Sequence, residues 1–478
     1  MNRNSLPRLC IRALVCSCFL LTATAGHSGP ARPPVLDIPQ GSVSSHWLWN
    51  ASVGQWEPLG SLREPRGRPA GSVRLASSSG FPLSVAGGWQ LSPAIACHAG
   101  RNEVLAVWED SRNGTDLDVY GQRFAADGTL IGENFAVVIG EHDQGAPVLL
   151  YNPSGGGYLL LWHHRQRDDY GIYGQMLSAL GTPLGTCFHV SWPRDGRQWM
   201  PSAVYNPLAD EFLVVWEDMS TSAIVAQRIS PKGEAVGGRI LVSTRPKAQW
   251  DRPVVACATT SGHYLIAWDE LAAGDIFAQV LGANGAQCGP AVPICLAAGQ
   301  QFVSAVAYND SLNEYLTVWT DERAVALRGS DIYAQRVATD GGLVGVEIMV
   351  STATGAQGGA VAAFDAVQQE YVLVWWDARD ERTGSDIYSR RISADGAGSG
   401  PEWALSTAIT DQVVPCLAHS AESDRYAVVW EDWQAGEDGE AEADLYGLVF
   451  SLQRFSVWLP QLARGWEALA PSSMALAP

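Results

Sequence analysis

A short apolar run that ends in tryptophan recurs along the chain at nearly constant intervals. The seven runs span residues 104–108, 158–162, 212–216, 264–268, 315–319, 371–375 and 426–430. Each run is almost entirely apolar instead of alternating, which predicts a β-strand that is buried on both faces. Successive tryptophans stand 51 to 56 residues apart, and such a period is typical of repeat architectures.

Other positions keep step with this tryptophan. Eighteen residues before it stands a glutamine in six of the seven repeats: Gln90, Gln144, Gln198, Gln301, Gln357 and Gln412, with Trp250 in the fourth. After it come a loop of variable length, a strand resembling Asp-Ile-Tyr and a turn glycine, so each repeat holds four short extended segments. Four strands in a repeat of this length form a propeller blade. We therefore predict an all-β, seven-bladed β-propeller of four-stranded antiparallel blades.

The two ends of the repeat region complement each other. Residues 81–85 match the fourth strand of a blade, whereas the seventh repeat stops after its third strand at residues 445–450. We predict that the N-terminal strand completes the seventh blade and closes the ring, because an open ring leaves a strand edge unpaired. Residues 455–459 are the alternative for the same place.

Composition divides the chain into four parts. Residues 1–25 combine arginines, an apolar run and a small-residue cleavage site, which is typical of a secretion signal peptide. Residues 26–75 are rich in Pro, Gly and Ser and are expected to form a linker or arm. The propeller is assigned to residues 76–452, and residues 453–478 to a C-terminal strand with a disordered tail.

Charge and cysteine content restrict the partners and the compartment. The formal net charge of −19 argues against a nucleic-acid partner. No segment after the signal peptide is apolar over the ~20 residues that a membrane span needs. We therefore expect a secreted or cell-surface protein that is a monomer. Export permits disulfides, and the spacing of Cys288 and Cys295 allows one, with burial as free thiols as the alternative.

The repeat motifs resemble those of a known group of proteins. Trp-Glu-Asp-Ser-Arg-Asn-Gly at residues 108–114 and Asp-Ile-Tyr-Ala-Gln-Arg at residues 331–336 resemble the repeats of exported bacterial β-propeller proteins. These are distantly similar to the TolB-type propeller, whose repeats also carry Asp-Ile-Tyr after a variable loop. The resemblance extends from about residue 80 to about residue 452 and implies the fold, without implying a function.

A carboxylate stands two residues after the tryptophan in most repeats. These residues are Asp110, Asp218, Glu270, Asp321, Asp377 and Asp432, with His164 in the second repeat. Hard cations prefer oxygen ligands, so Ca²⁺ is the one possible cofactor, with the five aspartates as weak candidate ligands. The structural alternative is that each carboxylate caps a turn or pairs with a loop arginine such as Arg112. We favour this alternative, because a feature of nearly every blade is typical of architecture.

Departures from the repeat are better candidates for a functional site. The second repeat carries His163 and His164 in place of acids, and the segments between blades carry the aromatic residues Trp89, Trp199, Trp250 and Phe302. Aromatic rings beside polar groups suit sugar or peptide ligands, so these six residues form the predicted ligand-binding set. Packing between blades is the alternative. We expect no metal at the two histidines, because neighbouring residues on a strand point in opposite directions.

Known catalytic motifs are absent from the sequence. It contains no Gly-x-Ser-x-Gly, no His-Glu-x-x-His and no phosphate-binding Gly-Lys-Ser/Thr. We therefore predict a non-enzymatic binding or interaction scaffold that binds a polysaccharide, a peptide or a protein at the mouth of the central channel. Two alternatives stay open: a secreted carbohydrate-active hydrolase or lyase, and a structural envelope protein.

Overall fold

The computed structural model describes ten segments of the chain. These are residues 47–50, 55–58, 80–114, 116–166, 169–191, 197–244, 253–270, 274–398, 400–435 and 441–451. The predicted signal peptide, most of the predicted arm, Trp250, and residues 453–478 with the alternative closing strand lie outside them. Within the predicted arm, β1 (Trp47–Asn50) pairs with β2 (Gln55–Pro58) as an antiparallel hairpin.

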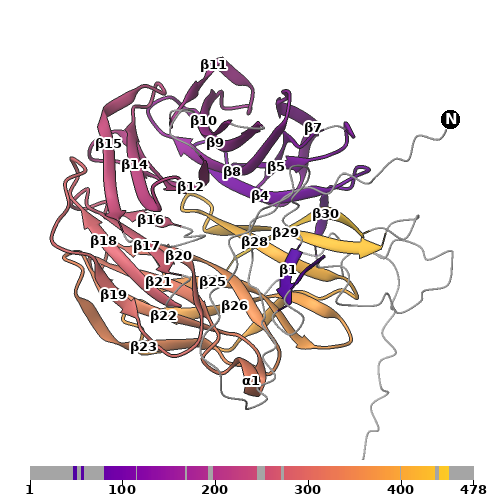
Figure 1. The fold of residues 1–478 in the computed structure, drawn as a ribbon. Helices are drawn as coiled ribbons and strands as arrows, with labels where there is room; N and C mark the ends of the chain where they lie inside the picture. Colours follow the sequence, from indigo (N-terminus) through magenta and orange to yellow (C-terminus); the bar gives the residue numbers. More distant parts are fainter. Residues whose placement is uncertain are drawn as a thin grey trace, which may run out of the picture.

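The remaining described strands form seven four-stranded sheets that follow one another around a ring (Figure 1). Blade 1 consists of β4 (Gln90–His98), β5 (Glu103–Asp110), β6 (Asp118–Ala125) and β7 (Leu130–Val138). Blade 2 consists of β8 (Asp143–Asn152), β9 (Gly157–Gln166), β10 (Asp169–Leu177) and β11 (Pro183–His189). Blade 3 consists of β12 (Gln198–Asn206), β13 (Glu211–Asp218), β14 (Ala223–Ile229) and β15 (Ala235–Thr244).

The second half of the ring repeats this order. Blade 4 consists of β16 (Val254–Cys257), β17 (Tyr264–Glu270), β18 (Asp275–Leu281) and β19 (Val292–Cys295). Blade 5 consists of β20 (Gln301–Asn309), β21 (Glu314–Asp321), β22 (Asp331–Ala338) and β23 (Leu343–Ser351), with the short helix α1 (Val325–Arg328) between β21 and β22. Blade 6 consists of β24 (Gln357–Asp365), β25 (Glu370–Asp380), β26 (Gly384–Ser393) and β27 (Trp403–Ser406).

Blade 7 contains both ends of the repeat region. Its strands β28 (Asp411–Ser420), β29 (Arg425–Ala435) and β30 (Ala441–Phe450) are completed by β3 (Phe81–Ser84), which pairs antiparallel with β30. The first strands of neighbouring blades contact one another all around the ring, and β28 contacts β4. The predicted seven-bladed propeller and its closure by the N-terminal strand are thus confirmed.

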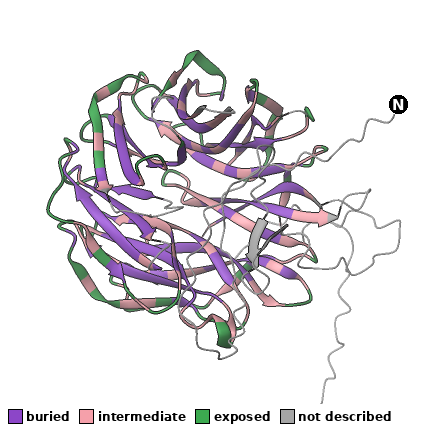
Figure 2. Ribbon diagram, in the orientation of Figure 1, coloured by how far each residue is buried: buried purple, intermediate pink, exposed green. Residues whose placement is uncertain are grey.

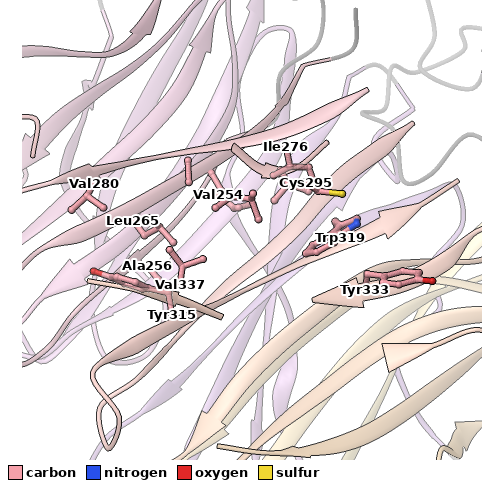
Figure 3. Close-up of a cluster of buried hydrophobic side chains, with 14 of the residues drawn as sticks. Val254, Ala256, Leu265, Ile276, Val280, Cys295, Tyr315, Trp319, Tyr333 and Val337 are labelled. Carbon is pink, nitrogen blue, oxygen red and sulfur yellow. The ribbon is translucent and has the colours of Figure 1, made fainter. Parts of the chain in front are cut away.

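The signature tryptophans form the centre of the packing between blades. All seven are at most 2% exposed, because the second strand of each blade is covered on both sides. Figure 3 shows one such cluster, in which Trp319, Tyr315 and Tyr333 of blade 5 pack against Val254 and Leu265 of blade 4. A sheet with two apolar faces must bury both, and a closed ring does so without leaving a terminal blade uncovered.

Burial is uneven within each blade. Figure 2 shows the inner strands mostly buried, whereas exposed residues gather on the fourth strands and the connecting segments. Every residue of β13 is buried, whereas in β11 six of the seven residues are exposed. The solvent-facing parts of the blades are therefore the outer strands and the two sets of connections at either end of the strands.

Two faces of the ring follow from the strand order. We call loop face the one that carries the loops between second and third strands together with the crossings from one blade to the next. We call turn face the opposite one, with the turns between first and second strands. Among the described residues, no helix is long and apolar enough to cross a membrane, and the six cysteines of the blades are free thiols.

Candidate functional site

Backbone hydrogen bonds hold the loop face together. In four blades the residue three positions after the signature tryptophan donates its amide to the crossing that leads into the same blade. The pairs are Ser111 to Trp89 (3.0 Å), Met219 to Arg197 (2.9 Å), Glu322 to Gln300 (2.8 Å) and Ala378 to Ala356 (2.8 Å). This third position is therefore fixed beside the crossing, whichever side chain it carries.

The repeated aspartates of the loop face are enclosed by donors. Asp110 accepts from Trp108 Nε1 (2.7 Å) and from Arg112 Nε and Nη2 (2.8 and 2.6 Å). Asp321 and Asp377 make the same contacts with the arginine two positions further on. These contacts are the turn caps and arginine pairs of the structural alternative given above.

The other two candidate calcium ligands have different donors. Asp218 accepts from Ser220 and Arg239, and Asp432 accepts from Gln412. All five aspartates are at most 4% exposed. Their carboxylate oxygens therefore face protein donors instead of solvent.

The position directly after the tryptophan joins neighbouring blades. Glu109 Oε1 accepts from the amide of Ala146 (2.8 Å), and Glu431 Oε1 accepts from the amide of Ser92 (2.9 Å). Both amides belong to residues with positive φ, 47° and 51°, at bulges in the first strand of the next blade. A carboxylate at this position thus fixes an inter-blade contact, which gives it a structural use.

Blade 2 carries His163 at that same position. The ring stacks on Trp199 of blade 3, with centroids 4.3 Å apart, and His163 and Trp199 are only 6% and 5% exposed. Burial, with Arg165 and His164 adding to it, lowers the pKa of His163 to about 3, so the ring is neutral. These two predicted ligand-binding residues therefore pack on each other between blades.

The other predicted ligand-binding residues are dispersed. His164 lies on the opposite side of β9 from His163, beside Tyr173 (5.3 Å between ring centroids), as expected for neighbouring strand residues. Trp89 is half-buried in the crossing to blade 1 and Phe302 is half-buried in blade 5. The structure brings His163 and Trp199 together, and it places Trp89 and Phe302 in other blades.

We expect Gly145→Ala to destabilise the protein by about 1–3 kcal/mol. A Cβ at Gly145 would stand 2.5 Å from Nε2 of His163, and the stacked ring of Trp199 prevents the imidazole from moving away. Thermal unfolding measures the effect. Gly87→Ala is the matched control, because a Cβ at Gly87 meets nothing within 4 Å. In the double variant with His163→Ala, the stability lost through Gly145→Ala should be regained. If it is not, this explanation is wrong.

Glu322 is a buried carboxyl group that these structural uses do not include. It stands three positions after Trp319, where the other repeats carry Ser, Arg, Met, Leu, Ala and Trp. The residue is 5% exposed, and its Oε1 atom is buried without a hydrogen-bond partner. Burial, and secondarily the charge of Asp321, raises the pKa of Glu322 to about 7.

The loop that contains α1 builds the surroundings of Glu322. It runs from Glu322 to Ser330 and is bonded to the crossing into blade 6, where Gly355 donates its amide to Arg328 O (2.7 Å). Gly329 has a φ of 97°, and a Cβ there would stand 2.5 Å from the Gly355 carbonyl oxygen. This close approach requires glycine, and it keeps the loop against blade 6.

Glu322 follows directly after β21, which ends at Asp321 at the loop-face end of blade 5. Blade 6 is the next blade in the ring, and Leu316 and Val318 of β21 pack in one cluster with its Trp375. On the blade 6 side, Asp386 precedes Tyr388 by two positions and pairs with Asp377 across the sheet. Burial raises the pKa of Asp386 to about 6, although Thr383 Oγ1 donates to it at 2.7 Å.

Two carboxyl groups with raised pKa values thus lie at the loop-face ends of the neighbouring blades 5 and 6. The sequence analysis assigned neither residue to a catalytic site. The sequence signal for Glu322 was weak, because it is the one acidic residue at a position that has no consensus in the repeat. Nothing in the repeat distinguishes Asp386 from the aspartates at equivalent positions.

The sequence matches no protein-family model and no curated protein. Solved structures do show the fold. The BP39L lectin from Burkholderia pseudomallei is 11% identical, with 76% of this chain and 96% of the lectin covered and a TM-score of 0.53. An endo-arabinase from Bacteroides thetaiotaomicron is 13% identical over 65% and 96% of the two chains (TM-score 0.37). The GH43_1 enzyme from Xanthomonas citri is 12% identical over 56% and 94% (TM-score 0.34).

These comparisons correct one prediction. The similar structures are mostly enzymes that carry the names of glycoside hydrolases, and they contradict a non-enzymatic binding scaffold in favour of the carbohydrate-active alternative. The prediction failed because it relied on the absence of short catalytic motifs, and a pair of carboxyl groups has no such motif. At identities of 8 to 14% the similarity transfers no substrate, reaction or residue to this chain.

Proposed function

We propose that this protein is a carbohydrate-active enzyme, a hydrolase or a lyase, in which Glu322 is the general acid. The observation that carries the proposal is the state of this side chain. Glu322 is buried, has an oxygen without a hydrogen-bond partner and has a pKa of about 7. A carboxylic acid that keeps its proton near neutral pH is the group that glycosidic bond cleavage requires at the leaving oxygen.

Asp386 is the second group in this proposal. Its pKa of about 6 lies below that of Glu322, so between these values Asp386 is mainly ionised while Glu322 is mainly protonated. Two carboxyl groups whose environments separate their pKa values in this way can act as base and acid. In a hydrolase the carboxylate of Asp386 would activate water, and in a lyase it would accept a proton from the sugar ring.

Export belongs to the same proposal. The signal peptide, the secreted or cell-surface location and the similarity to TolB-type propellers are predictions from the sequence. An exported enzyme meets the polysaccharides of cell walls and of decaying plant material, which do not enter cells as polymers. The proposal therefore joins the predicted location to a substrate that is found there.

A screen of polysaccharides tests the function. Purified protein is incubated with neutral and acidic plant and cell-wall polymers, and new reducing ends or the ultraviolet absorbance of unsaturated sugars are recorded. Glu322→Gln should lose the activity. Glu381→Gln, an exposed position in the loop between β25 and β26 of the same face, should keep it. No product from any polymer, or full activity of Glu322→Gln, would contradict the proposal.

We expect a bell-shaped pH profile of kcat/KM on any substrate that the screen identifies. Activity should decrease as the pH drops under about 6, because Asp386 takes up a proton, and as it rises over about 7, because Glu322 loses one. Initial rates between pH 4 and 9 measure the profile. Asp386→Asn should abolish activity across this whole pH range. A profile that stays flat between pH 5 and 9 would exclude this pair as acid and base.

A further inference from the structure

The turn face of blades 6 and 7 holds a group of metal-ligating side chains. Asp365 ends β24 in blade 6, His419 lies near the end of β28 in blade 7, and Asp424 lies in the turn that follows. One ligand atom from each lies within 4.8 Å of the other two. This is the one such group of three within the described ranges, and it is far along the strands from the proposed active site on the loop face.

The same place is closed by a direct hydrogen bond in other blades. In blade 3 the hydroxyl of Tyr205 donates to Asp210 (2.7 Å), and in blade 5 that of Tyr308 donates to Asn313 (2.6 Å). Counted from the signature tryptophan, His419 stands at the tyrosine position. Its ring also contacts the aromatic residue at the start of the next strand, as those tyrosines do, and stacks on Tyr426 with ring centroids 4.4 Å apart.

Blade 7 leaves this place open. Nε2 of His419 stands 3.8 Å from Oδ1 of Asp424 and 3.9 Å from Oδ2 of Asp365. Both distances are too long for a hydrogen bond, and Nε2 is buried without a partner. Asp365 is a further departure, because blades 2, 3 and 5 carry Asn152, Asn206 and Asn309 at its position.

We propose that Asp365, His419 and Asp424 bind a divalent cation of the Zn²⁺ type. Zinc accepts imidazole nitrogen and carboxylate oxygen at ~2.0–2.2 Å, which separates two ligand atoms in a tetrahedron by about 3.4 Å. The two distances from His419 Nε2, 3.8 and 3.9 Å, exceed this separation by about 0.4–0.5 Å, and all three ligand atoms lie within 4.8 Å of one another. One imidazole and two carboxylates neutralise the ion and leave its fourth position to water.

The site is partly built before the ion arrives. Oδ1 of Asp365 accepts the amides of Val367 (2.8 Å) and Gln368 (2.9 Å), and Oδ2 accepts the hydroxyl of Tyr426 (2.7 Å). Such bonds orient a ligating carboxylate and raise the affinity for metal. His419 and Asp424 retain 14% and 24% side-chain exposure, which gives an ion access from solvent.

Bound zinc would connect blade 6 to blade 7. Blade 7 is the blade that β3 completes, so the ion would reinforce the ring next to the place where its two ends meet. A metal ion that binds the folded state and not the unfolded state raises the free energy of unfolding by mass action. The proposal is independent of the enzymatic function, because its ligands lie on the opposite face.

Calorimetric titration of the chelator-treated full protein with ZnCl₂ tests the site. We expect one ion per chain and a rise in Tm on zinc addition. Asp424→Asn should weaken binding by at least about 10-fold. His419→Tyr should lose binding while keeping the Tm of the metal-free protein, because it restores the tyrosine–aspartate contact of blade 3.

The control has a histidine in the corresponding turn of another blade. His263 lies between β16 and β17 of blade 4 on the same face, and His263→Gln should bind zinc like the unmodified protein. No zinc binding by the unmodified protein, or unchanged zinc affinity of both His419→Tyr and Asp424→Asn, would overturn the proposal.

Discussion

Asp110→Ala is expected to lower the free energy of unfolding by about 3–5 kcal/mol. The carboxylate of Asp110 is fully buried and accepts Trp108 Nε1 and the guanidinium of Arg112. Its removal leaves the indole N–H without an acceptor and the partly buried arginine without its counter-charge. Nη2 of Arg112 also donates to Ser84 of β3 (3.1 Å), so the loss reaches the strand that closes the ring.

Denaturant unfolding followed by circular dichroism measures this effect, and the chain contains a matched control. Asp380 and Arg382 repeat the Asp-x-Arg arrangement, with Nε at 2.9 Å and Nη2 at 2.7 Å from the carboxylate, but on the surface. Asp380→Ala should leave the midpoint unchanged, because exposed ion pairs contribute little. Equal midpoints for Asp110→Ala and the unmodified protein would show that burial does not set the strength of this contact.

The repeat made the fold predictable from the sequence. Seven copies of the same pattern give seven independent indications of one blade, and a strand that is apolar on both sides fits only between neighbours. Ring closure was predictable for a related reason. Residues 81–85 match a fourth strand without a blade, and the seventh repeat ends at residues 445–450 without a fourth strand. The fold therefore follows from hydrophobic periodicity, which is a property of the sequence alone.

The candidate site was only partly predictable. His163 and Trp199 were noticed as departures from the repeat, yet their stacking between blades depends on the space left at Gly145, which the sequence does not display. Glu322 stands at a position that has no consensus in the repeat, so the sequence does not mark it. Its importance lies in burial and in a missing hydrogen-bond partner, and these depend on how the α1 loop lies on blade 6.

The zinc ligands illustrate the same limit. Asp365 and His419 are 54 positions apart, at residues 365 and 419, so no local motif joins them. Their proximity arises because the first strands of consecutive blades, β24 and β28, contact each other along the interface of those blades. A comparison of the repeats aligned on the tryptophan identifies such sites only when departures in two neighbouring blades are considered together.

Glu322→Gln should lower turnover on an identified substrate by about 10²–10⁴-fold, the usual contribution of a general acid. Glutamine keeps the size of the side chain and removes the proton that the leaving oxygen needs. Steady-state rates at pH 6.5 measure the loss. The loss of turnover should be much smaller on a substrate whose leaving group needs no proton. Equal losses on both substrates would indicate a positioning role for Glu322 instead of acid catalysis.

The same substitution should stabilise the protein at high pH. Burial raises the pKa of Glu322 from about 4.5 to about 7, so the folded state keeps a proton that the unfolded state releases, and stability falls as pH rises through this interval. Each unit of pKa difference corresponds to about 1.4 kcal/mol, so ionisation of Glu322 lowers the free energy of unfolding by about 3 kcal/mol above pH 7. Glutamine does not ionise, so the variant does not lose this stability.

Unfolding of both proteins at pH 4 and pH 8 should show equal stability at the lower pH and a more stable variant at the higher pH. If the difference between them does not change with pH, the carboxyl group of Glu322 is not protonated in the folded protein near neutrality, and the proposed general acid loses its basis.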